Sequence, residues 1–143
     1  MSSDPAYDLQ LVVVAALLAD PAVTSLVATG PDDGPAIYAP HQPFDDVWPR
    51  ITIEDIQVVQ AETSASHSST CHLTLHVWDQ GAQAALNVQR ISGAIRDCLQ
   101  QPLSPSGHRI SSFGFDGAHG VRDPDPNTAH RVVNHHFNTQ PTS

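Results

Sequence analysis

The segment Cys71–Trp78 constrains the fold most, because its side chains alternate strictly between two kinds. One set is apolar and the other is polar or aromatic: Cys71, Leu73, Leu75 and Val77 against His72, Thr74, His76 and Trp78. Successive side chains of a β-strand point to opposite faces of the sheet. The segment therefore predicts a strand with one face on a core and one face left open.

Two helices are predicted to cover the apolar face of this strand. The first spans about 82–100, where apolar residues recur at spacings of three and four. The second spans Ala6–Ala19, after the helix-start signal Asp4-Pro5. From Leu11 onward this second helix is apolar almost all round, which predicts burial on more than one side.

Further elements complete an α+β pattern. A short helical stretch is predicted over 22–28, after the cap signal Asp20-Pro21. Other strands are predicted over 37–39, 50–61, 108–115 and 131–137, with an interruption of the second at Glu54-Asp55. Short connections favour antiparallel pairing. We therefore expect a small, mostly antiparallel sheet of four to five strands with two helices on one face, in the order α-β-β-β-α-β-β.

The chain is expected to form one domain over residues 5–137, followed by a loose polar tail over 138–143. The two cysteines, Cys71 and Cys98, each lie on the apolar side of a predicted element. We interpret both as reduced, buried, small hydrophobic residues rather than as a disulfide.

The charge balance excludes several function classes. Fifteen acidic residues stand against six arginines and no lysine, which gives a formal net charge of −9. A nucleic-acid binder or a protein of anionic membrane surfaces needs clustered basic residues, and the arginines here are scattered. The longest apolar run, Leu11–Ala19, is too short to span a membrane and has no basic start typical of a signal peptide.

Nine histidines raise the alternative of a metal site. On a strand, His72 and His76 lie about 13 Å apart, and the adjacent His135 and His136 point to opposite faces. A cross-strand pair such as His72 with His136 stays open as an alternative. The prediction is no metal, with the histidines at the surface or in an interface.

The segment from Gly114 to Asn127 contains two fragments of known motifs. Asp123, Asp125 and Asn127 match the start of a calcium loop, but the required glycine and glutamate are absent, so an acidic turn between strands is predicted. The glycines at 114, 117 and 120 match no nucleotide-binding loop and are interpreted as strand-end glycines. No motif indicates a catalytic residue or a cofactor.

Large aromatic residues in polar surroundings are candidates for contact with other proteins. Phe44, Trp48 and Trp78 are either lids on the core or anchors of a subunit interface. The long predicted loops 63–70 and 117–127 could reach a neighbour. The candidate interface residues are Phe44, Trp48, His67, Trp78, Asp123, Asp125 and Arg131.

An ordered set of segments resembles a family of phage and prophage tail-completion proteins, also found in gene transfer agents, with the lambda-type tail-terminator fold. The set comprises "LLADPAVTSLV" (17–27), "AIYAP" (36–40), "TLHVWD" (74–79), "AIRDCL" (94–99) and "VRDPDPNTAHRVVNHHF" (121–137). The resemblance covers about residues 5–137. One departure is the acidic "TGPDDGPAIY" (29–38), where the family usually carries an arginine.

The resemblance implies a structural subunit of a ring rather than an enzyme. Such proteins form a hexameric ring in the virion, at the head-proximal end of the tail, which caps the tail tube and joins it to the head connector. The implied partners are other copies of the chain, the tail tube protein and the head-completion protein, while DNA passes the lumen without specific binding. Alternatives are another head–tail connector or minor tail protein, a histidine-based metal-dependent enzyme, and an acidic adaptor that binds a basic partner.

Overall fold

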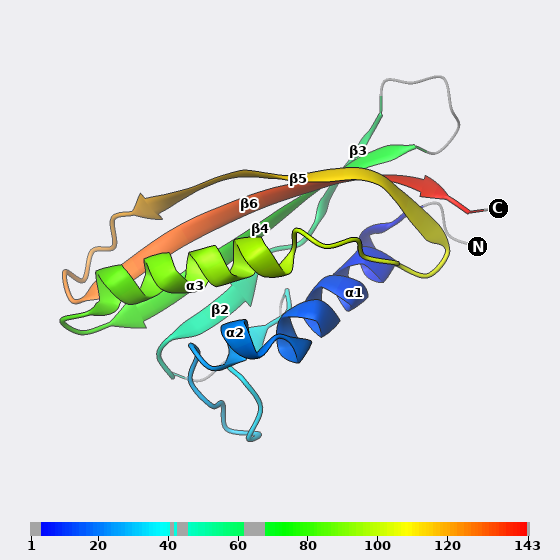
Figure 1. Cartoon of the computed structure of the whole chain (residues 1–143). Helices are drawn as coiled ribbons and strands as arrows, with labels where there is room; N and C mark the ends of the chain where they lie inside the picture. The colour runs from blue at the N-terminus through cyan, green and yellow to red at the C-terminus, as the bar shows by residue number, and fades with distance from the viewer. Residues whose placement is uncertain (1–3, 41, 43–45, 62–67, 143) are drawn as a thin grey trace.

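The computed structural model describes residues 4–40, 42, 46–61 and 68–142. Three helices and six strands follow one another along these residues (Figure 1). In chain order they are α1 (Ala6–Ala19), α2 (Pro21–Thr24), β1 (Ile37–Tyr38), β2 (Arg50–Ile53), β3 (Gln57–Gln60), β4 (Ser69–Gln80), α3 (Ala84–Cys98), β5 (His108–Val121) and β6 (Thr128–Pro141).

The strands form one sheet in the order β1-β2-β4-β6-β5, and β3 also pairs with β4. Strands β2 and β3 lie on the same side of β4, opposite Leu75–Trp78 and Ser69–His72 respectively. The predicted interruption at Glu54-Asp55 falls between them, where the Glu54 backbone N–H donates to the Thr74 carbonyl. The long strand β4 therefore holds both halves of the interrupted strand in one sheet.

The predicted α+β class is confirmed, but its details needed correction. The described chain has six strands instead of four to five, because the interruption splits one strand in two. The pairing of β1 with β2 is parallel, since the connection over residues 39–49 is long enough to return the chain to the same end of the sheet. The predicted helical stretch 22–28 is the one-turn helix α2, which adds a third helix and ends at Thr24.

The hairpin of β5 and β6 is longer than predicted. The strands extend to Val121 and start at Thr128, so the expected long connection from residue 117 shortens to residues 122–127. The three glycines lie within β5, and Gly117, with a φ of 146°, sits at an irregularity of the ladder. Residues 138–141, which were expected in a loose tail, are instead part of the sheet. They pair with β5, and residues 138–139 also pair with β4.

The predicted loop over residues 63–70 lies mostly outside the described residues. Its last two residues, Ser69 and Thr70, belong to β4, which therefore begins earlier than the sequence pattern indicates. Ser69 and Thr70 pair with β3 on one side and with β6 on the other. This pairing explains why two polar residues are part of a central strand.

The helices cover one face of the sheet and enclose the core (Figure 1). The apolar set of β4 is fully buried, as predicted from its alternation. It meets two rows of buried helix residues: Leu9, Val13 and Leu17 of α1, and Val88, Ile91, Ile95 and Cys98 of α3. Cys71 and Cys98 are both buried and free, which confirms their interpretation as small hydrophobic residues. Among the described residues, none of the helices is long and apolar enough to cross a membrane.

Helix α1 is buried on one side only. Its other side leaves Tyr7, Leu11 and Leu18 exposed, at 72%, 52% and 44% of their surface. The prediction that this helix is buried on more than one side is therefore not met within a single copy of the chain. The exposed apolar side chains form a stripe along the helix, since they recur at helical spacing.

Candidate interaction surfaces

An aromatic cluster lies on the open face of the sheet, at the end where β2 begins. The register places Trp78 of β4 between Arg50 of β2 and His130 of β6. The Trp78 and His130 rings stack with their centroids 3.7 Å apart and their planes 10° from parallel. The Arg50 guanidinium lies 3.9 Å from the centre of the Trp48 ring and 5.9 Å from that of Trp78. We call Trp48, Arg50, Trp78 and His130 the open-face cluster.

Arg50 holds the two tryptophans in place. It is buried, and burial lowers the pKa of its guanidinium, opposed by the nearby Asp46 carboxylate at 3.8 Å. A cation over an aromatic face is attracted to the negative centre of the ring, more strongly where water is excluded. The Trp78 indole N–H also donates to Thr52 Oγ1 at 3.1 Å. Both partly exposed rings are therefore held in position before any partner binds.

A hydrogen-bonded chain of side chains extends the open-face cluster along the sheet. His76 Nδ1 lies 2.6 Å from His130 Nε2, and His76 Nε2 contacts the Glu54 carboxylate. Where His130 Nε2 carries its proton, it donates to His76 Nδ1, and His76 Nε2–H then donates to the Glu54 carboxylate. Burial, followed by the neighbouring His76, lowers the pKa of His130. The surroundings of His130 in the cluster thus favour its neutral form.

A second polar contact lies farther along the open face. His136 Nδ1 is 2.6 Å from Asp116 Oδ1, and the His136 ring lies over Gly114. A Cβ at Gly114 would stand 2.9 Å from His136 Cε1, so a larger residue there would displace the His136 ring. His72 is the direct cross-strand neighbour of His136. No group of three or more metal-ligating side chains is placed to hold an ion within the described ranges.

The acidic segment between β5 and β6 is a turn. Asp123 Oδ1 accepts from the Asp125 backbone N–H, and Asp125 Oδ1 accepts from that of Asn127, each at 2.9 Å. Asp125 Oδ2 also accepts from the Thr128 hydroxyl at 3.1 Å. These carboxylates satisfy backbone donors of the turn, as aspartate commonly does. The prediction of an acidic turn is confirmed.

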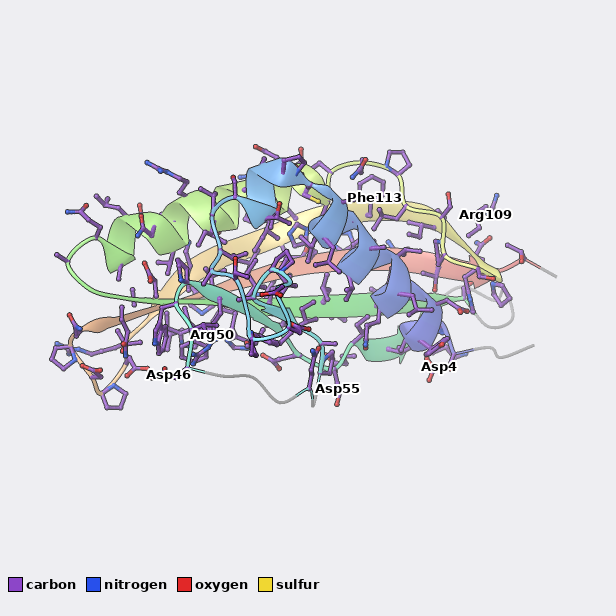
Figure 2. The ribbon with its side chains drawn as sticks, turned by 90° about the horizontal axis from the view of Figure 1, so that it is seen from below. Asp4, Asp46, Arg50, Asp55, Arg109 and Phe113 are labelled. Atoms are coloured by element: carbon purple, nitrogen blue, oxygen red, sulfur yellow. The ribbon has the colours of Figure 1, made fainter. Side chains whose placement is uncertain are left out.

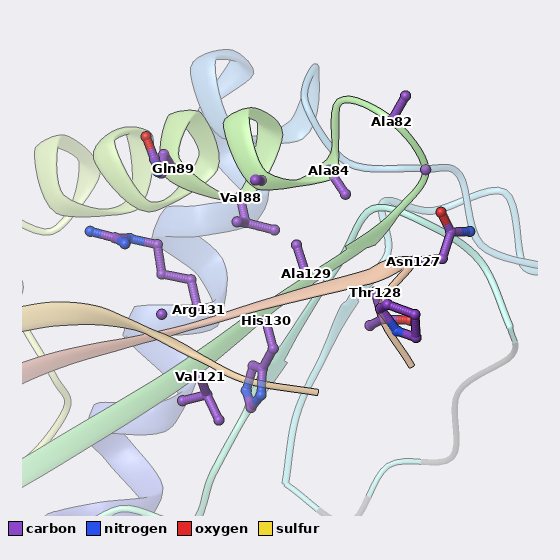
Figure 3. A pocket seen from close by; sticks show the side chains of 14 residues that line it. Ala82, Ala84, Val88, Gln89, Val121, Asn127, Thr128, Ala129, His130 and Arg131 are labelled. Carbon is purple, nitrogen blue, oxygen red and sulfur yellow. The ribbon is translucent and has the colours of Figure 1, made fainter. Parts of the chain in front are cut away.

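Arg131 lies on the other face of the sheet, in a cleft of about 430 Å³. The cleft opens between the first turns of α3, the last residues of β5 and the first residues of β6 (Figure 3). Its lining includes the apolar Ala85, Val88 and Ala129 and the polar Gln89. Arg131 Nε is buried and has no hydrogen-bond partner among the described residues. The cleft therefore combines apolar side chains and polar groups with a positive charge and an unsatisfied donor.

The candidate interface residues that the structure describes all lie at one end of the sheet. Trp48 and Trp78 lie on its open face, Asp123 and Asp125 in the adjoining turn, and Arg131 in the cleft behind. Figure 2 shows Arg50 and Asp46 near this end, far from Asp4 and Arg109. Phe44 and His67 fall outside the described residues.

Sequence reasoning missed Arg50, His76 and His130 as members of this site. The signal for two of them was present, because Arg50 and His76 sit at positions whose parity places them on the open face. The contacts of these residues within the site depend on the register between strands that are distant in sequence, which alternation alone does not give.

Comparison with known proteins gives a consistent result. The chain is similar to one from the virion of a native gene transfer agent particle, with a TM-score of 0.81 and 19% identity over 96% of this chain and 98% of that one. It is also similar to the bacteriophage SPP1 gp17 protein, with a TM-score of 0.60 and 22% identity over 93% and 89% of the two chains. At these identities the likeness shows a shared fold. A search of curated proteins finds no match.

A family model described as tail completion protein gp17 matches residues 12–139. This range includes most of both long helices, the sheet, the open-face cluster and the cleft. The segments whose sequence resembles tail-completion proteins lie wholly within it. The chain therefore belongs to the tail completion protein gp17 family.

Proposed function

We propose that this chain is a structural subunit of a ring that caps a phage-like tail tube and joins it to the head connector. The observation that carries the proposal is the family match over residues 12–139, which takes in nearly all of the sheet and most of both long helices. The partners are other copies of the chain, the tail tube protein and the head-completion protein. The place of action is the head-proximal end of the tail, in the virion.

The physical properties of the chain fit this role. A ring of identical subunits needs two different surfaces on each copy, one for each neighbour. Strand β5 is a long outer strand of the sheet, and such an edge offers backbone groups to a partner. A net charge of −9 on each copy would repel DNA from the lumen and let it slide through. Pre-fixed aromatic side chains, such as those of the open-face cluster, are typical anchors of interfaces.

The experiment compares particles assembled with and without this chain, by electron microscopy of negatively stained samples. Without the chain we expect tail tubes of variable, excessive length that are not joined to heads, because nothing stops polymerisation or offers a docking face. Supplying the wild-type chain should restore tails of uniform length on heads. Tails of normal length attached to heads in its absence would contradict the proposal. Tails of normal length without heads would place the chain elsewhere in the junction and contradict the capping role.

A further inference from the structure

The exposed stripe of α1 is unusual for a helix on the surface of a globular protein. Tyr7 and Leu11 are each more than half exposed, and Leu18 lies farther along the same side. Polar or charged residues usually occupy the solvent side of such a helix. Large apolar side chains in a row on one side instead mark a surface that another protein covers. The stripe therefore has the composition of a docking surface.

The cleft beside α3, of about 430 Å³, offers apolar contacts to such a stripe. Its lining combines small and apolar side chains at the α3 end, among them Ala82, Ala85 and Val88, with polar ones such as Gln89 and Thr128. Leu86, on the first turn of α3, is 63% exposed next to these lining residues. Arg131 adds a positive charge whose buried Nε lacks a hydrogen-bond partner among the described residues. The apolar side chains of a helix could fill such a cleft, and a carboxylate beside them could pair with Arg131.

The start of the stripe and the cleft lie at opposite ends of the molecule. Near the start of α1, Asp8 Oδ2 lies 3.2 Å from Nδ1 of His108, the first residue of β5. The cleft contains Val121, the last residue of the same strand. A 14-residue strand rises by about 3.3 Å per residue and thus spans roughly 40 Å. Two different surfaces so placed cannot meet within one copy, and they suit a head-to-tail contact between copies.

Charge favours a second copy of this chain as the occupant. Residues 1–62, which include α1, carry ten of the fifteen acidic residues and one of the six arginines. Residues 63–143, which include both sides of the cleft, carry the other five acids and five arginines. The whole net charge of −9 therefore lies in the first part, while the second part is neutral and holds Arg90, Arg122 and Arg131 in or beside the cleft lining. The acidic first part of one copy is therefore repelled less by the neutral second part of another copy, with its arginines at the cleft, than by a second acidic part.

We propose that the exposed stripe of α1 (Tyr7, Leu11 and Leu18) docks in the cleft between α3 and the β5–β6 hairpin of a second copy of this chain. The inference rests on the proposed ring and names the surfaces that hold it together. Each copy gives its α1 to one neighbour and its cleft to the other, so the contact repeats until the ring closes. Arg131 then faces the acidic N-terminal part of the neighbour, where Asp4 and Asp8 flank the stripe.

Cysteine cross-linking in assembled particles tests this contact. The double variant Leu11→Cys with Ala85→Cys is treated with a short bismaleimide and run on a denaturing gel. Burial raises the pKa of the Cys71 thiol. It also raises the pKa of the Cys98 thiol, to about 12, so both native cysteines should react little. Both new cysteines replace exposed side chains, so the fold should be kept. We expect a ladder of dimers, trimers and larger products up to the ring size.

Matched controls separate the possible outcomes. Either single variant should give no ladder, nor should Leu11→Cys with Val59→Cys, because Val59 is 43% exposed on β3 but lies outside the cleft. If rings are visible in the particles but the double variant gives no ladder, the docking contact is overturned and the proposal of a ring stands. Dimers from Leu11→Cys alone, or its linkage to the tail tube protein, would equally overturn it, in favour of that other occupant. Particles without rings would overturn the proposed function, and the contact with it.

Discussion

Replacing Phe137 by alanine is expected to lower the free energy of unfolding by about 3–5 kcal/mol. Phe137 is 1% exposed and is among the largest fully buried side chains. It lies on β6 between Cys71 of β4 and Phe113 of β5, and its ring stacks on Phe113 with the centroids 6.2 Å apart. The substitution removes apolar contacts from three strands at once and leaves a cavity that the sheet cannot close without distortion.

Urea unfolding of the wild-type and Phe137→Ala chains, followed by circular dichroism, measures this loss. Leu86→Ala is the matched control, because Leu86 is an apolar side chain that is 63% exposed in one copy of the chain. The control should change the unfolding free energy by less than about 0.5 kcal/mol, since surface substitutions usually do. A loss below about 1 kcal/mol for Phe137→Ala would contradict the placement of this residue in the core.

Acid is expected to destabilise the chain through His135. This residue is 2% exposed, and its Nε2 has no hydrogen-bond partner among the described residues. Burial lowers its pKa from 6.5 to about 4, with Arg96 and His136 acting in the same direction and Asp116 opposing them. Between these two pH values the unfolded chain binds the proton and the folded chain does not. Stability therefore falls as the pH drops from 6.5 to 4, by about 2–3 kcal/mol from this residue.

The contribution of His135 is measured by comparing His135→Gln with the wild-type chain in urea unfolding at several pH values. Other groups that titrate in this range are common to both chains and cancel in the difference. The variant should lose less stability than the wild type between pH 6.5 and 4, and the gap should stop widening below pH 4. His72→Gln is the control, because His72 is exposed, and it should keep the wild-type slope. Equal slopes for wild type and His135→Gln would refute this account of His135.

Much of the fold could be predicted wherever one side of an element meets the core. Helix α1 spans the predicted residues Ala6–Ala19, and β4 contains the predicted strand with its apolar set buried. The β5–β6 hairpin could not be delimited, because β5 is an edge strand whose glycines and half-exposed side chains show no clear alternation. The parallel pairing of β1 could not be predicted either, since two residues carry too little pattern to set a direction.

The candidate site could be predicted in part. Trp48 and Trp78 were recognised because large aromatic residues in polar surroundings are unusual. Their link through Arg50, and the stacking of His130 on Trp78, depend on strand register and could not be predicted from one sequence. The all-round apolar character of α1 was visible in the sequence. Only the structure shows that one side of this helix remains uncovered in a single copy.

The most direct test of the ring is electron cryo-microscopy of the junction between head and tail in the assembled particle. The proposed function predicts a closed ring of copies of this chain around a central channel, between the last layer of the tail tube and the head connector. A single copy of the chain at this junction, or a junction that lacks the chain altogether, would contradict the proposed ring.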